Sequence, residues 1–196
     1  DIGDAVAIPV VQRVDGGDGG RAGEWPVAIG IRHLRNRRPA QQVLHTIQTN
    51  GTLLTDEWCE LLAEHRFLVG ISIDGPPALH DRYRVDKRGE PTSAKVLQGL
   101  RRLQEHGVDV NVLCTVNAAN QDHPLEVYRY FRDDLDLQHI QLIPIVERVN
   151  DTGFQEGDTV TDRSVDPATW GAFLVAVFDE WVRCDVGEVF VQMFDE

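Results

Sequence analysis

The feature that most constrains the fold is a repeated unit, in which an apolar run ends abruptly in polar residues and a helix follows. The four apolar runs cover residues 43–48, 67–71, 108–115 and 139–145. Strands that alternate with helices in this way are typical of a parallel sheet. The carboxyl ends of parallel strands share one rim, where ligands bind. The polar residues after the four runs are therefore the first candidates for a functional site.

Local signals predict where the helices between these strands begin. Thr55 can cap the first helix, because its side chain can accept a hydrogen bond from the first turn. Further helices are expected to start near Thr92, at Pro124 and after Asp166. The last helix has the clearest apolar face, formed by Trp170, Phe173, Leu174, Val177, Phe178 and Trp181.

Four strand–helix repeats are few for a closed barrel. The sequence therefore predicts an α/β fold with an incomplete parallel (βα) barrel in residues 41–196. Residues 1–40 are rich in Gly and Arg and lack an apolar period, so we expect an irregular or non-homologous segment there, with short strands possible at 5–11 and 27–31. The polar stretch 147–165 interrupts the repeat and predicts a long loop, and such loops are commonly functional.

Charge and hydropathy exclude two classes of partner. The net charge of −13 argues against a nucleic-acid binder, since phosphate binding needs clustered cations. The basic cluster at 32–38 is short and reads as a solvated segment. No apolar stretch approaches the roughly 20 residues that span a bilayer, and no secretory signal is evident. We therefore expect a cytoplasmic protein without nucleic-acid or membrane partners.

The three cysteines, Cys59, Cys114 and Cys184, are far apart and form no CxxC pair. Their odd number and wide spacing do not indicate a disulfide framework. We interpret them as reduced structural residues, and we predict no metal ligands in this chain. The neighbouring residues His80 and Asp81, with Asp74, match no known ligand spacing, and surface charge is the simpler interpretation.

Two segments carry a family resemblance: QTNGTLL at 48–54, and LVGISIDGPPALHDRYRVDKRG at 68–89. There the chain resembles the radical S-adenosylmethionine (SAM) enzymes, and within them the anaerobic sulfatase-maturating enzymes. The similarity continues through CTVNAANQDHPLEVYRYF, HIQLIPIVER and FDEWVRCDVGEVFVQMFD, to the end of the chain. SIDGP alone occurs in many radical SAM proteins, whereas the ordered set of segments is specific.

The resemblance implies a partial (βα)6 barrel that holds a [4Fe-4S] cluster and SAM. In that family, reductive cleavage of SAM gives a 5′-deoxyadenosyl radical, which removes hydrogen from the Cβ of a Cys or Ser in a sulfatase peptide. Oxidation then gives Cα-formylglycine. The implied class is therefore an oxidoreductase of post-translational modification, with a sulfatase or other peptide as partner. The chemistry belongs to the cofactors, and the protein positions the substrate. Catalytic residues in this chain remain unknown.

Three site residues follow from the SIDGP segment. The resemblance implies that Ser72 contacts the SAM ribose and that Asp74 shapes the turn after it. Arg84 would pair with the methionine carboxylate, since a guanidinium forks onto a carboxylate. Each has a simpler alternative: Ser72 and Asp74 could merely close a tight turn, and Arg84 could pair with Asp81 or Asp86 on the surface.

Three more positions fall on the rims of other strands. Gln48 and Asn50 would lie near SAM or the peptide, and Ile145 would pack against the adenine. Asn50 precedes Gly51 in a frequent turn dipeptide, and Ile145 could be ordinary core. Asn117 is a weaker rim candidate.

Departures from the family pattern bear on activity. The cluster-binding CxxxCxxC motif and the glycine-rich segment that meets the SAM amino group are absent from the sequence, as is the cysteine-rich auxiliary-cluster domain. We therefore expect a fragment of such an enzyme, inactive as given, whose first 35–40 residues come from a shifted reading frame or unrelated sequence. Two alternatives stay open. One is a degenerate, non-catalytic module that binds a peptide or partner. The other is an unrelated enzyme using Asp74, Glu147 or His123.

Overall fold

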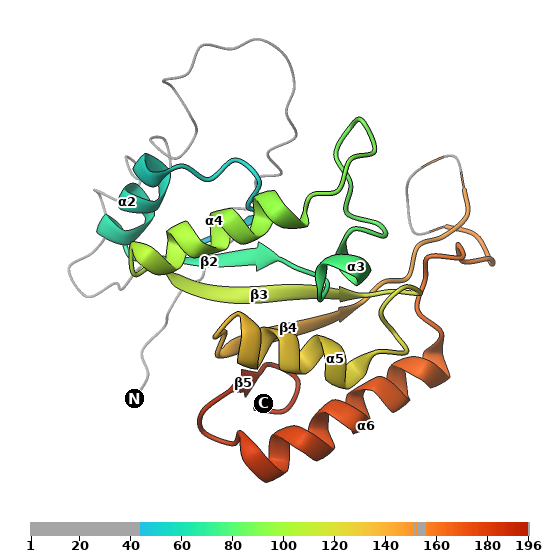
Figure 1. Ribbon diagram of the computed structural model, residues 1–196. Coiled ribbons are helices and arrows are strands. Elements are labelled where there is room, and N and C mark those ends of the chain that lie inside the picture. The colour runs from blue at the N-terminus through green and yellow to red at the C-terminus, as the bar shows by residue number, and fades with distance from the viewer. Residues whose placement is uncertain (1–43, 151, 153–155, 196) are drawn as a thin grey trace, which may run out of the picture.

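A five-stranded parallel sheet forms the centre of the protein, in the spatial order β1-β2-β3-β4-β5 (Figure 1). The computed structural model describes residues 44–150, 152 and 156–195, so the predictions for 1–40 lie outside the described residues. The four predicted strands are confirmed, and a two-residue fifth strand was not predicted. The strands are β1 His45–Thr49, β2 Phe67–Ser72, β3 Asp109–Val116, β4 His139–Pro144 and β5 Phe190–Val191.

The helices start where their caps predict. Thr55 accepts a hydrogen bond from the Trp58 backbone N–H at 3.4 Å, and Asp166 accepts one from Thr169 at 2.9 Å. A short helix, α3, and a π-helical turn, η1, were not predicted. No helix in the described part of the chain is long and apolar enough to cross a bilayer. The helices are α2 Asp56–Glu64, α3 Pro77–His80, α4 Ser93–Glu105, α5 Pro124–Arg129, η1 Tyr130–Asp134 and α6 Pro167–Cys184.

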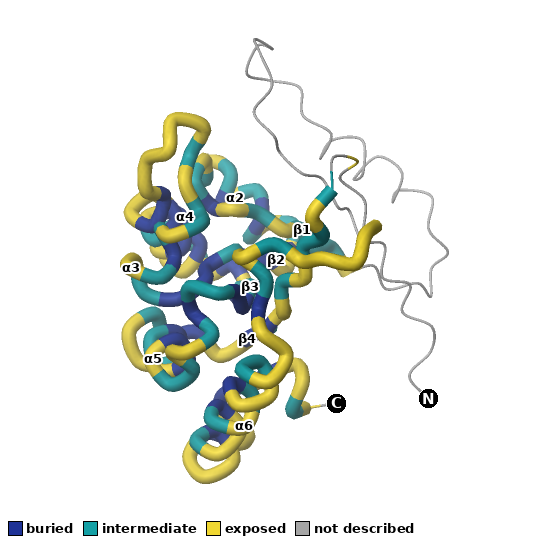
Figure 2. Tube along the Cα trace, turned by 90° about the vertical axis from the view of Figure 1, so that its right-hand side faces the viewer, coloured by how far each residue is buried: buried dark blue, intermediate teal, exposed yellow. Residues whose placement is uncertain are grey.

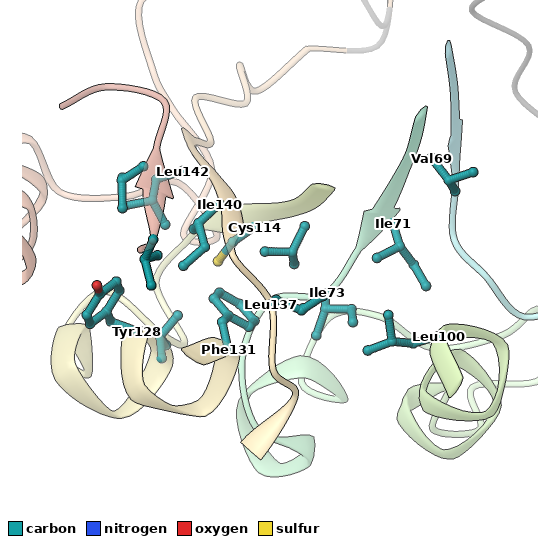
Figure 3. Packing of buried hydrophobic residues seen from close by; sticks show 14 of the residues in the cluster. Val69, Ile71, Ile73, Leu100, Cys114, Tyr128, Phe131, Leu137, Ile140 and Leu142 are labelled. Atoms are coloured by element: carbon teal, nitrogen blue, oxygen red, sulfur yellow. The ribbon is translucent and has the colours of Figure 1, made fainter. Parts of the chain in front are cut away.

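The helices gather on one face of the sheet (Figure 2). Because side chains alternate along a strand, residues such as Ile71, Cys114 and Ile140 face these helices and form the core, which includes Leu100 and Phe131 (Figure 3). Complete burial of one such aliphatic side chain stabilises the fold by about 1.5–3 kcal/mol. The alternate residues on the opposite face are mixed: Leu68, Leu113 and Ile143 are apolar, and the polar ones include Gln48, Ser72, Asn111, Thr115 and Gln141.

The predicted apolar face of α6 is only partly correct. Phe173, Val177 and Trp181 are buried, but Phe178 is 41% exposed. Phe178 lies at the edge of the buried stripe, where its ring contacts Phe194 edge-on at 5.2 Å. Several apolar residues of α6 are exposed, among them Val175 and Val182, because only one stripe of the helix packs against the core.

A buried polar cluster joins α6 to the π-helical turn. The Tyr128 hydroxyl donates to Asp185 Oδ2 at 2.7 Å, and Arg132 Nη1 donates to the same oxygen at 2.8 Å. Arg132 Nη1 also lies 3.0 Å from Glu180 Oε1. Burial raises the pKa of Tyr128, so its hydroxyl remains a donor at neutral pH. These bonds orient α6 against α5.

Helix α4 approaches the loop after β1 at two glycines. Gly51 has φ +71°, a left-handed conformation that favours glycine. A Cβ on Gly99 would overlap the carbonyl oxygen of Gly51. Gly171 in α6 provides a contrast, because nothing lies within 4 Å of the place where its Cβ would be.

We expect Gly99→Ala to lower the free energy of unfolding by about 1–3 kcal/mol, because α4 must move away from the loop after β1. The matched helical variant, Gly171→Ala, should leave it unchanged or raise it by up to about 1 kcal/mol, because alanine favours helix. Urea unfolding followed by circular dichroism compares the two. Equal effects of both variants would show that the close approach does not constrain the fold.

Candidate functional site

The carboxyl end of β2 carries a buried ion pair between Asp74 and Arg84. Arg84 Nε donates to Asp74 Oδ2 at 2.6 Å, and Nη2 donates to Oδ1 at 3.0 Å. The Asp74 residue is only 3% exposed. Paired parallel bonds of this kind fix both distance and orientation. The loop from β2 is therefore held to the segment after α3.

Two residues of the next strand and its loop complete this arrangement. The Thr115 backbone N–H donates to Asp74 Oδ1 at 2.8 Å, and Arg84 Nη2 donates to Thr115 Oγ1 at 3.1 Å. Asn120 Nδ2 donates to the main-chain oxygen of Asp74 at 2.9 Å. The ends of β2 and β3 are thus joined through the carboxylate and the guanidinium.

These contacts correct two interpretations made from the sequence. Arg84 pairs with Asp74 and not with Asp81 or Asp86. Asp81 Oδ1 instead accepts the backbone N–H groups at the start of α4 at 3.0 and 2.9 Å, while Asp86 lies 3.5 Å from Lys95. The interpretation of Asp74 and His80 as surface charge is wrong, because both are buried. The sequence does not reveal which of several nearby carboxylates the chain brings to Arg84.

Ser72 and Arg84 place polar groups at the same end of the sheet face opposite the described helices, here called the open face. Ser72 lies between the buried residues Ile71 and Ile73, so its side chain points away from the helices. Its hydroxyl makes no hydrogen bond to any other described residue. The Arg84 side chain is 27% exposed, and its Nη1 likewise has no partner in 44–150, 152 and 156–195. The Ser72 hydroxyl can therefore donate a bond to a ligand or accept one from it, and Arg84 Nη1 can donate one.

The remaining predicted rim residues differ in their exposure and in the hydrogen bonds that they already make. Gln48 is exposed on the open face of β1, the first strand in the described part of the sheet. The Asn50 side chain accepts bonds from the N–H and hydroxyl of Thr52, at 3.2 and 3.0 Å, and so shapes its own turn. Ile145 is half-buried, and its N–H donates to Val116 at 2.9 Å. Asn117 is buried, and its side chain bonds to the main chain of its own loop.

The residues of the unrelated-enzyme alternative have separate partners. His123 Nδ1 lies 2.8 Å from Glu126, on the exposed surface. Glu147 accepts a bond from the Thr161 hydroxyl at 2.9 Å. Asp74 is engaged by Arg84. These separate pairings disfavour a joint acid–base role for Asp74, His123 and Glu147.

The cysteines do not fit an iron–sulfur cluster. Cys59 and Cys114 are fully buried in the core, where burial raises the pKa of both thiols and so opposes the thiolate that binds metal. Cys184 is exposed at the end of α6. Among the residues that the structure describes, no group of three or more His, Cys, Asp or Glu could hold a metal ion. No catalytic step can be derived through a cluster from these residues.

Sequence comparison identifies the family. The profile of the Radical SAM superfamily matches residues 9–131, which is more than half of the chain. The chain therefore belongs to the radical SAM superfamily. It is 48% identical, over 76% of its length, to the serine-type anaerobic sulfatase-maturating enzyme of Bacteroides thetaiotaomicron, of which it covers 38%. It is 32% identical, over 79% of its length, to the cysteine-type enzyme of Clostridium novyi, of which it covers 40%.

Structural comparison agrees with this assignment. The solved structure of anSMEcpe with bound AdoMet matches 88% of the chain with a TM-score of 0.73 and 28% identity, and 45% of that structure is covered. Native anSMEcpe with bound AdoMet and Kp18Cys peptide matches 86% of the chain with a TM-score of 0.73 and 28% identity, with 46% of that structure covered. The predicted incomplete radical SAM barrel is confirmed. The chain spans less than half the length of the sulfatase-maturating enzymes it matches.

Sequence reasoning missed Thr115, Asn120 and His80, which build the site around Asp74. Thr115 lies on the same face of the sheet as Ser72, because Ser72 is paired with Leu113, which is two residues before Thr115 in the neighbouring strand. The alternation of side chains along the strand could therefore have identified Thr115 from the sequence. The contacts of Asn120 and His80 depend on how loops fold back over the sheet, and no local pattern marks them.

We expect Asp74→Asn to lower the free energy of unfolding by about 2–4 kcal/mol, because it leaves the Arg84 charge without its carboxylate. A double-mutant cycle with Arg84→Gln measures the coupling directly, and urea unfolding gives each value. The matched cycle on the exposed pair Lys95–Asp86 should show little coupling. Equal couplings in the two cycles would contradict a special role for the buried pair.

Proposed function

We propose that the chain forms the SAM-binding part of the barrel of a sulfatase-maturating enzyme. In this proposal Ser72 binds the ribose hydroxyls, and Arg84 directs its free Nη1 toward the methionine carboxylate. The observation that carries the proposal is that these two unpartnered groups lie at the same end of the open sheet face, beside a pair that fixes Arg84 in place. The solved relatives bind AdoMet, which supports the same ligand here.

The other rim residues have secondary parts in this proposal. Gln48 is exposed on the same face and can bond to the adenosyl group or to a peptide. Ile145 offers an apolar surface to the adenine. Asp74 acts by holding Arg84 and not by contacting SAM, since its carboxylate is already engaged. Asn50 acts by shaping the loop after β1, because its side-chain oxygen is already bonded within its own turn.

The reaction proposed for the whole enzyme is oxidation of a peptidyl Ser or Cys to Cα-formylglycine. The names of the relatives support this reaction, and the Kp18Cys peptide bound to one solved relative supports a peptide substrate. Identity is higher to the serine-type enzymes, at 48% and 37%, than to the cysteine-type enzyme, at 32%, which favours serine. Turnover of two peptides that differ only in Ser or Cys distinguishes these substrates in an enzyme with its cluster.

We further propose that the chain is a fragment of that enzyme and is inactive as given. Its sequence lacks CxxxCxxC, and the described cysteines do not fit a cluster. After anaerobic incubation with iron, sulfide, reductant and SAM, we expect no 5′-deoxyadenosine by chromatography. Formation of 5′-deoxyadenosine would contradict the proposed inactivity. A peptide that binds without turnover would favour the degenerate binding module.

We expect Ser72→Ala to weaken SAM binding roughly 3- to 10-fold and Arg84→Gln roughly 10- to 100-fold, since a bond to a charged group is the stronger of the two. Isothermal titration calorimetry of the chain with SAM measures both. Thr46→Ala is the matched control, because Thr46 lies on the same face at the opposite end of β1.

Two results would contradict the proposed site. If the chain does not bind SAM, its open face is not a SAM site. If it binds SAM and the three variants bind equally well, SAM lies elsewhere. Circular dichroism of each variant confirms that the fold is retained, so that a loss of binding is not a loss of structure.

A further inference from the structure

His80 is a buried histidine beneath the Asp74–Arg84 pair. It closes the short helix α3, and only 1% of its surface is exposed. Both ring nitrogens have partners: Nδ1 lies 3.2 Å from the backbone nitrogen of Asp74, and Nε2 lies 3.2 Å from Thr92 Oγ1. The proposed function gives this residue no part.

The partners of His80 fix its tautomer. The backbone N–H of Asp74 can only donate, so Nδ1 must carry a lone pair. The Thr92 hydroxyl donates its one proton to the main-chain oxygen of Arg84 at 2.6 Å. Thr92 Oγ1 therefore accepts from Nε2–H. Both ends of the ring require the same neutral form, protonated at Nε2.

We propose that His80 is a positioning residue for SAM binding, whose neutral ring holds the main chain of Asp74 and, through Thr92, that of Arg84. One continuous chain of hydrogen bonds thereby holds the backbones of both Asp74 and Arg84 in place. The inference rests on the proposed function, because SAM is the ligand whose carboxylate Arg84 would meet. His80 does not contact SAM and acts through Asp74 and Arg84.

Protonation of His80 would break this chain of bonds. A proton on Nδ1 would face the N–H of Asp74, and two donors cannot bond to each other. The charged groups around the ring are the carboxylates of Asp74 and Asp81 and the guanidinium of Arg84, with neutral Tyr130 nearby. Burial lowers the pKa of His80 below its ordinary value and outweighs the two carboxylates.

The direction of the pH effect follows from this lowered pKa. The unfolded chain binds the His80 proton more readily than the folded chain, so stability falls as pH drops below the ordinary histidine value of about 6.5. SAM binding should fall only where the folded chain itself begins to protonate His80 and loses the arrangement, because at higher pH the ring is neutral in both the free and the SAM-bound protein. At higher pH, the protonation of His80 should add no pH dependence to SAM binding.

The test uses three substitutions of His80 that remove its two side-chain hydrogen bonds separately or together. His80→Asn can keep an acceptor near the Nδ1 position, His80→Gln can keep a donor near the Nε2 position, and His80→Phe keeps neither. Calorimetry with SAM should give about tenfold weaker binding for His80→Phe, as expected for loss of one or two hydrogen bonds, with partial rescue in the two amide variants. His106→Gln, at the far end of α4, is the control.

The pH profile separates positioning from a merely structural role. For the wild-type chain, SAM affinity should stay constant above the ordinary histidine pKa of about 6.5 and fall only below it, because burial lowers the pKa of His80 and keeps the folded ring neutral at higher pH. The profile of His80→Phe should be flat, and that of His106→Gln should match the wild type. Nitrogen-15 NMR of the histidine rings in the wild-type chain should show the Nε2–H tautomer for His80 at neutral pH. This measurement does not depend on the folding of any variant.

Two failures are distinguishable. If the wild-type chain binds SAM and the His80 variants retain both its affinity and its pH profile, the inference about His80 is wrong while the proposed function stands. An Nδ1–H tautomer in the NMR spectrum has the same meaning. If the wild-type chain binds no SAM at any pH, the proposed function fails, and the role of His80 in SAM binding fails with it.

Discussion

The bidentate ion pair between Asp74 and Arg84 determines how the loops at the sheet rim are arranged. Burying a carboxylate is costly unless hydrogen bonds replace its hydration. Here Asp74 accepts two bonds from Arg84 and one from the backbone of Thr115, which replace much of the lost hydration. These bonds join the loop after β2, the segment after α3 and the end of β3. The positions of Arg84 and Thr115 at that rim depend on them.

The sheet has two different faces, and the difference defines where a ligand can bind. The helices and the apolar core occupy one face (Figures 2 and 3). The strand registers place several polar residues of β1 to β4 on the other face. The open face ends at the rim that the ion pair organises. Membership of the radical SAM superfamily and the AdoMet-bound relatives support a SAM site at this rim. The described cysteines, by contrast, belong to the core and to the far end of α6.

Much of the fold was predictable because its signals are local. Apolar runs marked the four main strands, and Thr55, Pro124 and Asp166 marked helix starts. The two-residue strand β5 and the π-helical turn η1 are too short or too irregular for such patterns. Phe178 was mistaken for core because α6 has apolar residues on more than one side, so its sequence does not reveal which stripe will be covered. The candidate site at Ser72, Asp74 and Arg84 was predicted from the resemblance and not from a local pattern. Its internal bonding was not predictable, because Arg84 selects its carboxylate through tertiary geometry.

The central claim is that SAM binds at the rim where β2 and β3 end. The most direct measurement is an amide NMR titration of the isotope-labelled chain with SAM. The account predicts shifts concentrated in residues 72–75 and 115–117 and at the Arg84 side chain, with little change along α6. Shifts confined to α6, or no shifts at SAM concentrations in large excess over the protein, would contradict it.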